Sequence, residues 1–153
     1  MRAPRRILLV EDGREYTDGF TRLAAARGAE AEFVRAGNLA EARAALADGR
    51  PDAVFLDVVF DRTPEDALAG DLDGLIERHG GDRAAAIRHL TTNQGFYVLD
   101  ALADALAGVR VVLAYDFTAE PQRLAALRER FPELSGLPDG ASLGAALEDL
   151  LGR

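Results

Sequence analysis

Five short apolar runs, each followed by a segment with helical spacing, give this chain of 153 residues its organisation. The runs lie at 7–10, 31–34, 53–56, 109–114 and 133–137. Runs of this length read as strands, and those ending abruptly on acids suit strands buried on both faces. Parallel strands need crossover connections, and helices supply them. The pattern predicts an α/β fold with a doubly wound, five-stranded parallel sheet and helices on both faces.

The expected helices follow from apolar spacing and from residues that cap helix ends. Gly28 and Gly49 end the first two helices, and Asn38 is a candidate N-cap for the second. Gly108 ends a stripe that runs from Phe96 to Leu106. Thr118 is a candidate cap for the next helix, and the last helix carries the apolar residues Leu143, Leu147 and Leu150.

The segment 58–92 lies outside this alternation. It carries one helical stripe and, after Gly80 and Gly81, a second short helical candidate at 82–90. The stripe consists of Leu68, Leu72, Leu75, Ile76 and His79. An apolar stripe has to bury against something, so the prediction is an ordered helical hairpin. We expect one domain over residues 1–153 with an insertion at about 58–92.

Composition excludes several kinds of chemistry. The chain has no cysteine and no lysine, which rules out thiolate nucleophiles, Schiff bases and a lysine-dependent phosphate loop. A formal net charge of −8 disfavours sequence-independent binding to nucleic acid or to an anionic membrane. No apolar stretch approaches the length of a membrane span or of a secretory signal. We therefore predict a cytoplasmic protein that binds neither nucleic acid nor membrane.

Acidic residues follow two of the predicted strands. Glu11 and Asp12 end the first strand, and Asp57 ends the third. If the strand order is 2-1-3-4-5, the two strands are neighbours at the point where the order reverses, where open sheets bind ligands. Carboxylates suit Mg²⁺, with a backbone carbonyl such as that of Val59 and waters completing the shell. In the plainer interpretation, these acids cap the following helices or face solvent.

These residues carry a resemblance to a known family. The sequence Ile7-Leu8-Leu9-Val10-Glu11-Asp12, together with 51–57, resembles the receiver domain of two-component response regulators. The resemblance implies a flavodoxin-like fold of order 2-1-3-4-5. It also implies that Glu11 and Asp12 bind Mg²⁺ and that Asp57 accepts a phosphoryl group from a histidine kinase. Such chemistry is physically coherent, because a cation and fixed donors neutralise charge on the phosphoryl oxygens.

The chain departs from the family at its switch positions. Ala114 stands where the family has a serine or threonine, Leu137 precedes Pro138 where it has a lysine, and Leu134 stands where an aromatic is usual. Tyr115 and Thr118 could replace the hydroxyl if the register were shifted. The resemblance therefore implies a degenerate switch beside an intact acidic pocket.

The insertion starts beside this pocket and has open alternatives. Arg62 could supply the missing cation, or Arg62, Arg78, Arg83 and Arg88 could be solvated surface residues. The apolar stripe could dock a partner or a second copy of the chain, or it could pack on the chain's own third helix. Asp71-Leu72-Asp73-Gly74 lacks the further ligands of a calcium loop, and His79 and His89 lack an acidic partner at ligand spacing.

The leading prediction is a stand-alone receiver-like domain that works in phosphorelay signalling through protein–protein interaction and is not an enzyme beyond slow self-phosphorylation and dephosphorylation. Its partner would be a histidine kinase or another signalling protein, and a homodimer is possible. One alternative is a small Mg²⁺-dependent phosphohydrolase or phosphotransferase using the same carboxylates. The others are a phosphorylation-independent pseudo-receiver and a scaffold whose insertion is the functional part.

Overall fold

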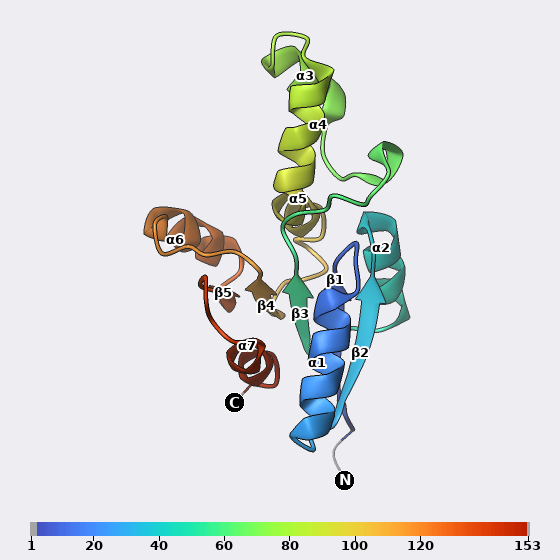
Figure 1. Cartoon of the computed structure of the whole chain (residues 1–153), viewed down its shortest axis with the longest axis vertical. Helices are drawn as coiled ribbons and strands as arrows, with labels where there is room; N and C mark the ends of the chain where they lie inside the picture. Colours follow the sequence, from blue (N-terminus) through green and yellow to red (C-terminus); the bar gives the residue numbers. More distant parts are fainter. Residues whose placement is uncertain (1–2, 153) are drawn as a thin grey trace.

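A five-stranded parallel sheet forms the centre of the molecule in the computed structural model, which describes residues 3–152. The strands are β1 (Arg5–Val10), β2 (Ala31–Ala36), β3 (Ala53–Leu56), β4 (Arg110–Leu113) and β5 (Leu134–Gly136). Their order is β2-β1-β3-β4-β5, so the predicted order 2-1-3-4-5 is confirmed (Figure 1). The order reverses between β1 and β3, which are neighbours in the sheet.

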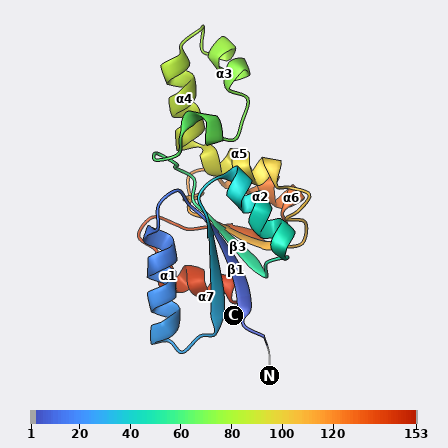
Figure 2. The same cartoon turned by 90° about the vertical axis from the view of Figure 1, so that its right-hand side faces the viewer.

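Helices cover both faces of the sheet (Figure 2). α1 (Glu15–Ala26) and α7 (Leu143–Leu150) pack on one face. α2 (Leu39–Asp48), α5 (Gln94–Ala101) and α6 (Pro121–Arg130) pack on the other. The fold is thus the doubly wound α/β architecture that the alternation of strands and helices predicts.

Alternate residues of each central strand enter different cores. Leu8, Val54 and Val111 point to the core shared with α2, α5 and α6. Leu9, Phe55 and Val112 point to the core shared with α1 and α7. Because side chains alternate across a strand, a strand buried on both faces must be apolar throughout. This requirement explains why the strands read as continuous apolar runs in the sequence.

The extra segment after β3 contains a short 3₁₀ turn (Glu65–Ala67), α3 (Leu72–Arg78) and α4 (Arg83–Thr92). α3 and α4 form a helical hairpin that projects beyond the carboxyl edge of the sheet (Figures 1 and 2). The hairpin has a small core in which Leu75 of α3 packs against Ala86 and Leu90 of α4, with Tyr97 of α5 beside them. The predicted stripe therefore packs mainly within the hairpin itself.

Two local expectations are wrong. Thr118 does not cap a helix: α6 starts at Pro121, whose fixed φ suits the first helical position, and Glu120 precedes it. The expected helix ending at Gly108 stops at Ala101, and the chain continues through hydrogen-bonded turns to Gly108. Among residues 3–152, no helix is long and apolar enough to cross a membrane.

Candidate functional site

The strand register places the predicted site residues in one row at the carboxyl edge of the sheet. Val10 pairs with Leu56, Leu56 with Leu113, and Leu113 with Gly136. The residues that follow these four are Glu11, Asp57, Ala114 and Leu137. Backbone hydrogen bonds continue the ladder, since Asp57 N donates to Val10 O and Ala114 N donates to Leu56 O, each at 2.9 Å. The structure thus brings the acids of β1 and β3 to the same edge.

Glu11 is buried, and the start of α1 satisfies its carboxylate. Oε1 accepts from Tyr16 N at 3.2 Å, while Oε2 accepts from Thr17 N at 2.6 Å and from Thr17 Oγ1 at 2.7 Å. An anion at a helix N-terminus is favoured by its unpaired N–H groups and by the helix dipole. For Glu11, the interpretation that strand-end acids cap the next helix therefore applies.

Asp57 is half-buried, and its oxygen Oδ1 accepts a hydrogen bond from Val58 N at 2.8 Å. The pKa of Asp57 is raised to about 6, mainly by burial and also by the negative charges of Glu11 and Asp12, against the lowering effect of the Val58 and Val59 N–H groups. Burial and the negative charges of Asp57, Glu11 and Glu15 also raise the pKa of Tyr16, whose ring lies 4.7 Å from that of Phe55. The charges of Glu11 and Asp12 therefore reach the Asp57 carboxyl.

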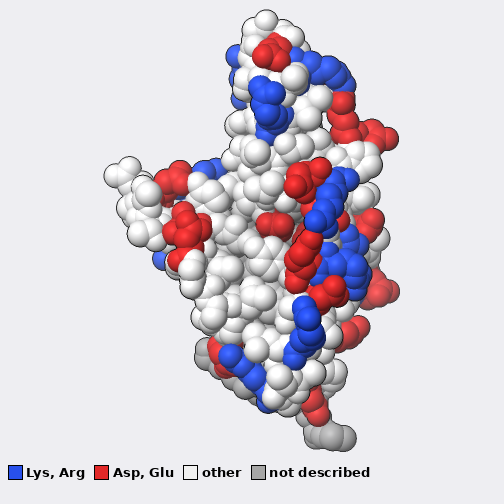
Figure 3. All heavy atoms as spheres, viewed as in Figure 1, with Lys and Arg blue, Asp and Glu red and all other residues white. Residues whose placement is uncertain are grey.

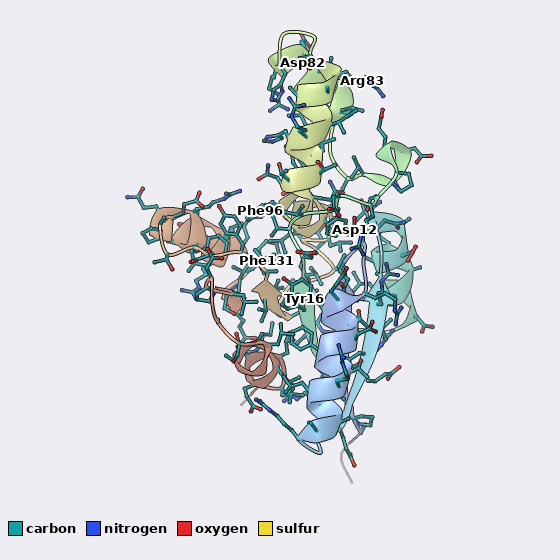
Figure 4. All side chains as sticks on the ribbon, in the orientation of Figure 1. Asp12, Tyr16, Asp82, Arg83, Phe96 and Phe131 are labelled. Carbon is teal, nitrogen blue, oxygen red and sulfur yellow. The ribbon has the colours of Figure 1, made fainter. Side chains whose placement is uncertain are left out.

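Asp12 is held by the segment that leaves β3. Its Oδ2 accepts from Arg62 N at 2.6 Å and from Thr63 Oγ1 at 3.4 Å. The Arg62 guanidinium in turn donates to Glu15 Oε1 at 2.5 Å, which lowers the pKa of Glu15. Figure 4 shows Asp12 at the base of the hairpin, above the start of α1 where Tyr16 lies. We call residues 58–63 the strap, because they cross the pocket from β3 towards the hairpin.

Arg62, the residue predicted to supply the missing cation, lies in the strap. Arg62 reaches the rim of the pocket, but its side chain is 59% exposed and pairs with Glu15 instead of Asp57. Of the other insertion arginines, Arg83 pairs with Glu65 within the insertion. Arg62 therefore contacts the acidic pocket through its backbone N–H, and its guanidinium takes a surface position.

The β4 and β5 half of the edge is apolar. Ala114 and Leu137 pack against the core that contains Phe20 and Phe55, and Leu134 is buried within β5. The Tyr115 hydroxyl bonds Glu120 and Arg123, and Thr118 is exposed. Neither hydroxyl replaces the one that Ala114 lacks. In Figure 3, a small acidic patch below the hairpin has uncharged surface on its left and further acidic and basic side chains on its right.

The donor chemistry of the pocket fits a hard divalent cation, because carboxylate oxygens from two strand ends are what Mg²⁺ prefers. As the side chains lie, however, residues 3–152 contain no group of three or more His, Asp or Glu side chains positioned to hold a metal ion. Glu11 is bound to α1 and Asp12 to the strap. A cation that takes Asp12 Oδ2 would therefore displace the strap's donors from that oxygen.

Sequence reasoning missed Gly95, Gln94 and Arg35. A Cβ on Gly95 would overlap the Asp57 carbonyl oxygen and lie 2.8 Å from Val58 Cα, so only glycine lets α5 approach this closely. Gln94 is buried and bonds both Ala69 N and Ala69 O. Arg35 donates to the carbonyls of Asp12 and Gly13. The only available signal was the Gln-Gly pair inside an otherwise helical pattern.

The weaker motifs have structural roles. Asp71 caps α3 by accepting from Gly74 N, and Asp82 caps α4 by accepting from Ala85 N. The His79 and His89 rings lie 5.8 Å apart across the hairpin. His79 Nδ1 contacts Leu75 O and His89 Nε2 contacts Tyr97 Oη. Both histidines thus make hydrogen bonds within the hairpin and its junction with α5.

No protein-family model matches the sequence, and no curated protein matches it. Solved structures do resemble the fold. A receiver domain from Methanospirillum hungatei has a TM-score of 0.60 at 13% identity, over 97% of this chain and 92% of that one. The NtrX receiver domain from Brucella abortus has a TM-score of 0.58 at 18% identity, over 96% and 99%. A Burkholderia pseudomallei response regulator, solved with a phosphorylated aspartic acid and calcium, has a TM-score of 0.57 at 16% identity, over 95% of this chain and 66% of that one. The chain has the receiver-domain fold.

Proposed function

We propose that this chain is a signalling domain of the receiver type, which acts through protein–protein interaction and carries its phosphoacceptor at Asp57. The observation that supports this proposal is the position of Asp57. It follows the central strand β3, beside Glu11 and at the point where the strand order reverses. A receiver-like fold alone admits many functions, so the proposal rests on this site.

The environment of Asp57 suits a nucleophile. Its carboxylate is half-buried, and Val58 N holds one oxygen in place. A pKa of about 6 leaves the group mostly ionised at neutral pH while making it more basic than an ordinary aspartate. An Asp57 oxygen would attack phosphorus, and the donor's histidine nitrogen would leave. The partner is accordingly a histidine kinase or another signalling protein.

We also propose Mg²⁺ as the cofactor, held by Glu11, Asp12, Asp57 and the backbone carbonyl of Val59. The cation would neutralise charge on the phosphoryl oxygens. The chain's own part is to hold Asp57 in place through Val58 and to concentrate negative charge at this edge. A net charge of −8 supports a cation and a protein partner, and disfavours nucleic acid.

The direct experiment records amide NMR shifts on adding Mg²⁺ and beryllofluoride, a phosphoryl mimic. We expect shifts around Glu11, Asp12 and Asp57 that disappear in Asp57→Asn. Asp52→Asn is the matched control, because Asp52 lies before the same strand at its other end and accepts from Arg6 N. Equal responses in wild type and Asp57→Asn would contradict a phosphoacceptor role.

The same acids permit a second function, a Mg²⁺-dependent phosphohydrolase or phosphotransferase. The exposure of this edge favours it, since Val59, two residues after Asp57, is 47% exposed. Steady turnover of added phosphoesters would support the enzyme, whereas a single slow phosphorylation of Asp57 would support the receiver. A pseudo-receiver would respond to neither.

A further inference from the structure

The strap contacts both the acidic pocket and the hairpin. On the pocket side, Arg62 N and Thr63 Oγ1 donate to Asp12. On the hairpin side, Phe60 N donates to Thr91 O of α4 at 2.8 Å. The Phe60 side chain is fully buried. A displacement of the strap at Asp12 therefore acts on the last turn of α4.

The start of the strap is held as tightly as its end. Gly95 N donates to Val58 O at 3.0 Å, and the close approach of Gly95 to the Asp57 carbonyl leaves no room for a side chain. Residues 57–63 thus lie between the β1–α1 loop on one side and the α4–α5 bend on the other. In a packed arrangement of this kind, a change at one contact is passed to the other by displacement.

We propose that the strap and a divalent cation compete for Asp12, so that cation binding in the acidic pocket releases the strap and loosens its contact with α4. The inference rests on the proposed function, because it takes the acidic pocket as the cation site. With the strap in place, Asp12 Oδ2 accepts from both Arg62 N and Thr63 Oγ1, and the acids do not form a metal-binding group. Carboxylate oxygens that accept two donors are less available to a metal ion.

This competition gives the insertion a role that the β4 and β5 half of the edge cannot fill. Ala114 and Leu137 have neither a hydroxyl nor a positive charge that could bind a phosphoryl group on Asp57. The strap does contact the pocket, and it leads to the element that projects furthest from the sheet (Figure 1). The hairpin is thus the part of the chain that changes when the pocket is occupied.

The test removes the side chains that hold the strap and measures Mg²⁺ affinity by NMR titration of amide shifts, without any phosphoryl donor. The double variant Glu15→Ala/Thr63→Val removes the ion pair and the hydroxyl donor while leaving Glu11, Asp12 and Asp57 intact. We expect it to bind Mg²⁺ about five-fold more tightly than the wild type, the scale of one exposed ion pair and one hydrogen bond. Glu65→Ala is the matched control, because it breaks an ion pair with Arg83 within the insertion.

Hydrogen exchange supplies the second readout. In Mg²⁺-free wild type, the Arg62 amide should be protected, and saturating Mg²⁺ should speed its exchange and that of Phe60. Equal Mg²⁺ affinity in wild type, the double variant and Glu65→Ala would overturn the competition and leave the proposed function standing. An absence of Mg²⁺ binding in all three would overturn both.

Discussion

The two halves of the sheet's carboxyl edge differ in chemistry although they share one register. At the ends of β1 and β3 stand three acids: Glu11 and Asp12 accept backbone N–H groups, and their charges together with burial raise the pKa of Asp57. At the ends of β4 and β5 stand Ala114 and Leu137, which pack against an apolar core. The comparison shows that the chain keeps the groups that could accept a phosphoryl and lacks the usual polar groups that could respond to it.

Aromatic contacts fix the position of Tyr115, the residue after Ala114, in the β4 and β5 half of the edge. The Tyr115 ring lies 5.1 Å from Phe96 and 4.8 Å from Phe117, both in edge-to-face arrangements. The Arg123 guanidinium lies 3.9 Å from the centroid of the Phe96 ring. These contacts hold the residue after Ala114 against α5 and α6 and away from Asp57. Under the proposed function, a response to events at Asp57 would therefore pass through the strap.

The largest expected effect comes from breaking the support of the acidic half with Gly95→Ala. The new Cβ would overlap the Asp57 carbonyl oxygen and approach Val58 Cα. Both are backbone atoms in the segment that directly follows β3. Overpacking against backbone costs about 3 kcal/mol, at the upper end of the usual range. Urea unfolding, followed by circular dichroism, measures the loss in the free energy of unfolding.

Gly19→Ala is the control for that substitution. In α1 the new Cβ would meet only Leu143 Cδ1, at 2.9 Å, and a side-chain end can move. Alanine also favours the helix by up to about 1 kcal/mol over glycine. A Gly95→Ala protein as stable as Gly19→Ala would contradict the close packing of α5 on Asp57.

The second largest effect is expected from Asp57→Asn, which removes a half-buried negative charge from the acidic half of the edge. The pKa of folded Asp57, about 6, lies above its ordinary value of 3.8. A raised carboxyl pKa stabilises the fold fully below the ordinary value, and that contribution is lost as pH rises through about 6. Asp57→Asn should therefore stabilise the protein by about 1–2 kcal/mol near pH 8, after allowance for partial solvent screening. The gain should shrink towards zero near pH 4.

Unfolding curves at several pH values would test this sign. Asp104→Asn is the control, since Asp104 is exposed and lies in the turns after α5, at a distance from the pocket. A stabilisation by Asp57→Asn that stayed constant with pH would show that the carboxyl is not destabilised by its burial. The pattern would then reflect packing of the amide instead.

Much of the fold was predictable because burial leaves a direct trace in the sequence. The continuous apolar runs around Leu9 and Phe55 exist because both faces of the sheet are covered, and with the resemblance to receivers they led to the observed strand order. The edge position of Asp57 followed from the same runs. The partners of Asp12 could not be predicted, because Arg62 N is a backbone donor whose position depends on how the insertion folds. The role of Gly95 was hidden for the same reason, since it depends on a tertiary approach.

The smallest expected effect comes from making the two halves alike with Leu137→Lys. Leu137 lies in the register position next to Ala114, and Ala114 lies next to Asp57. A lysine here would introduce the first lysine side chain of the sequence, and an opposite charge favours the ionised carboxylate. We expect the pKa of Asp57 to fall from about 6 by about one unit, as read from side-chain carboxyl shifts in an NMR titration. Leu137→Met keeps the apolar volume and should leave the pKa unchanged. If Leu137→Lys also leaves it unchanged, the ends of β3 and β5 are electrostatically independent, and only the strap side of the edge acts on Asp57.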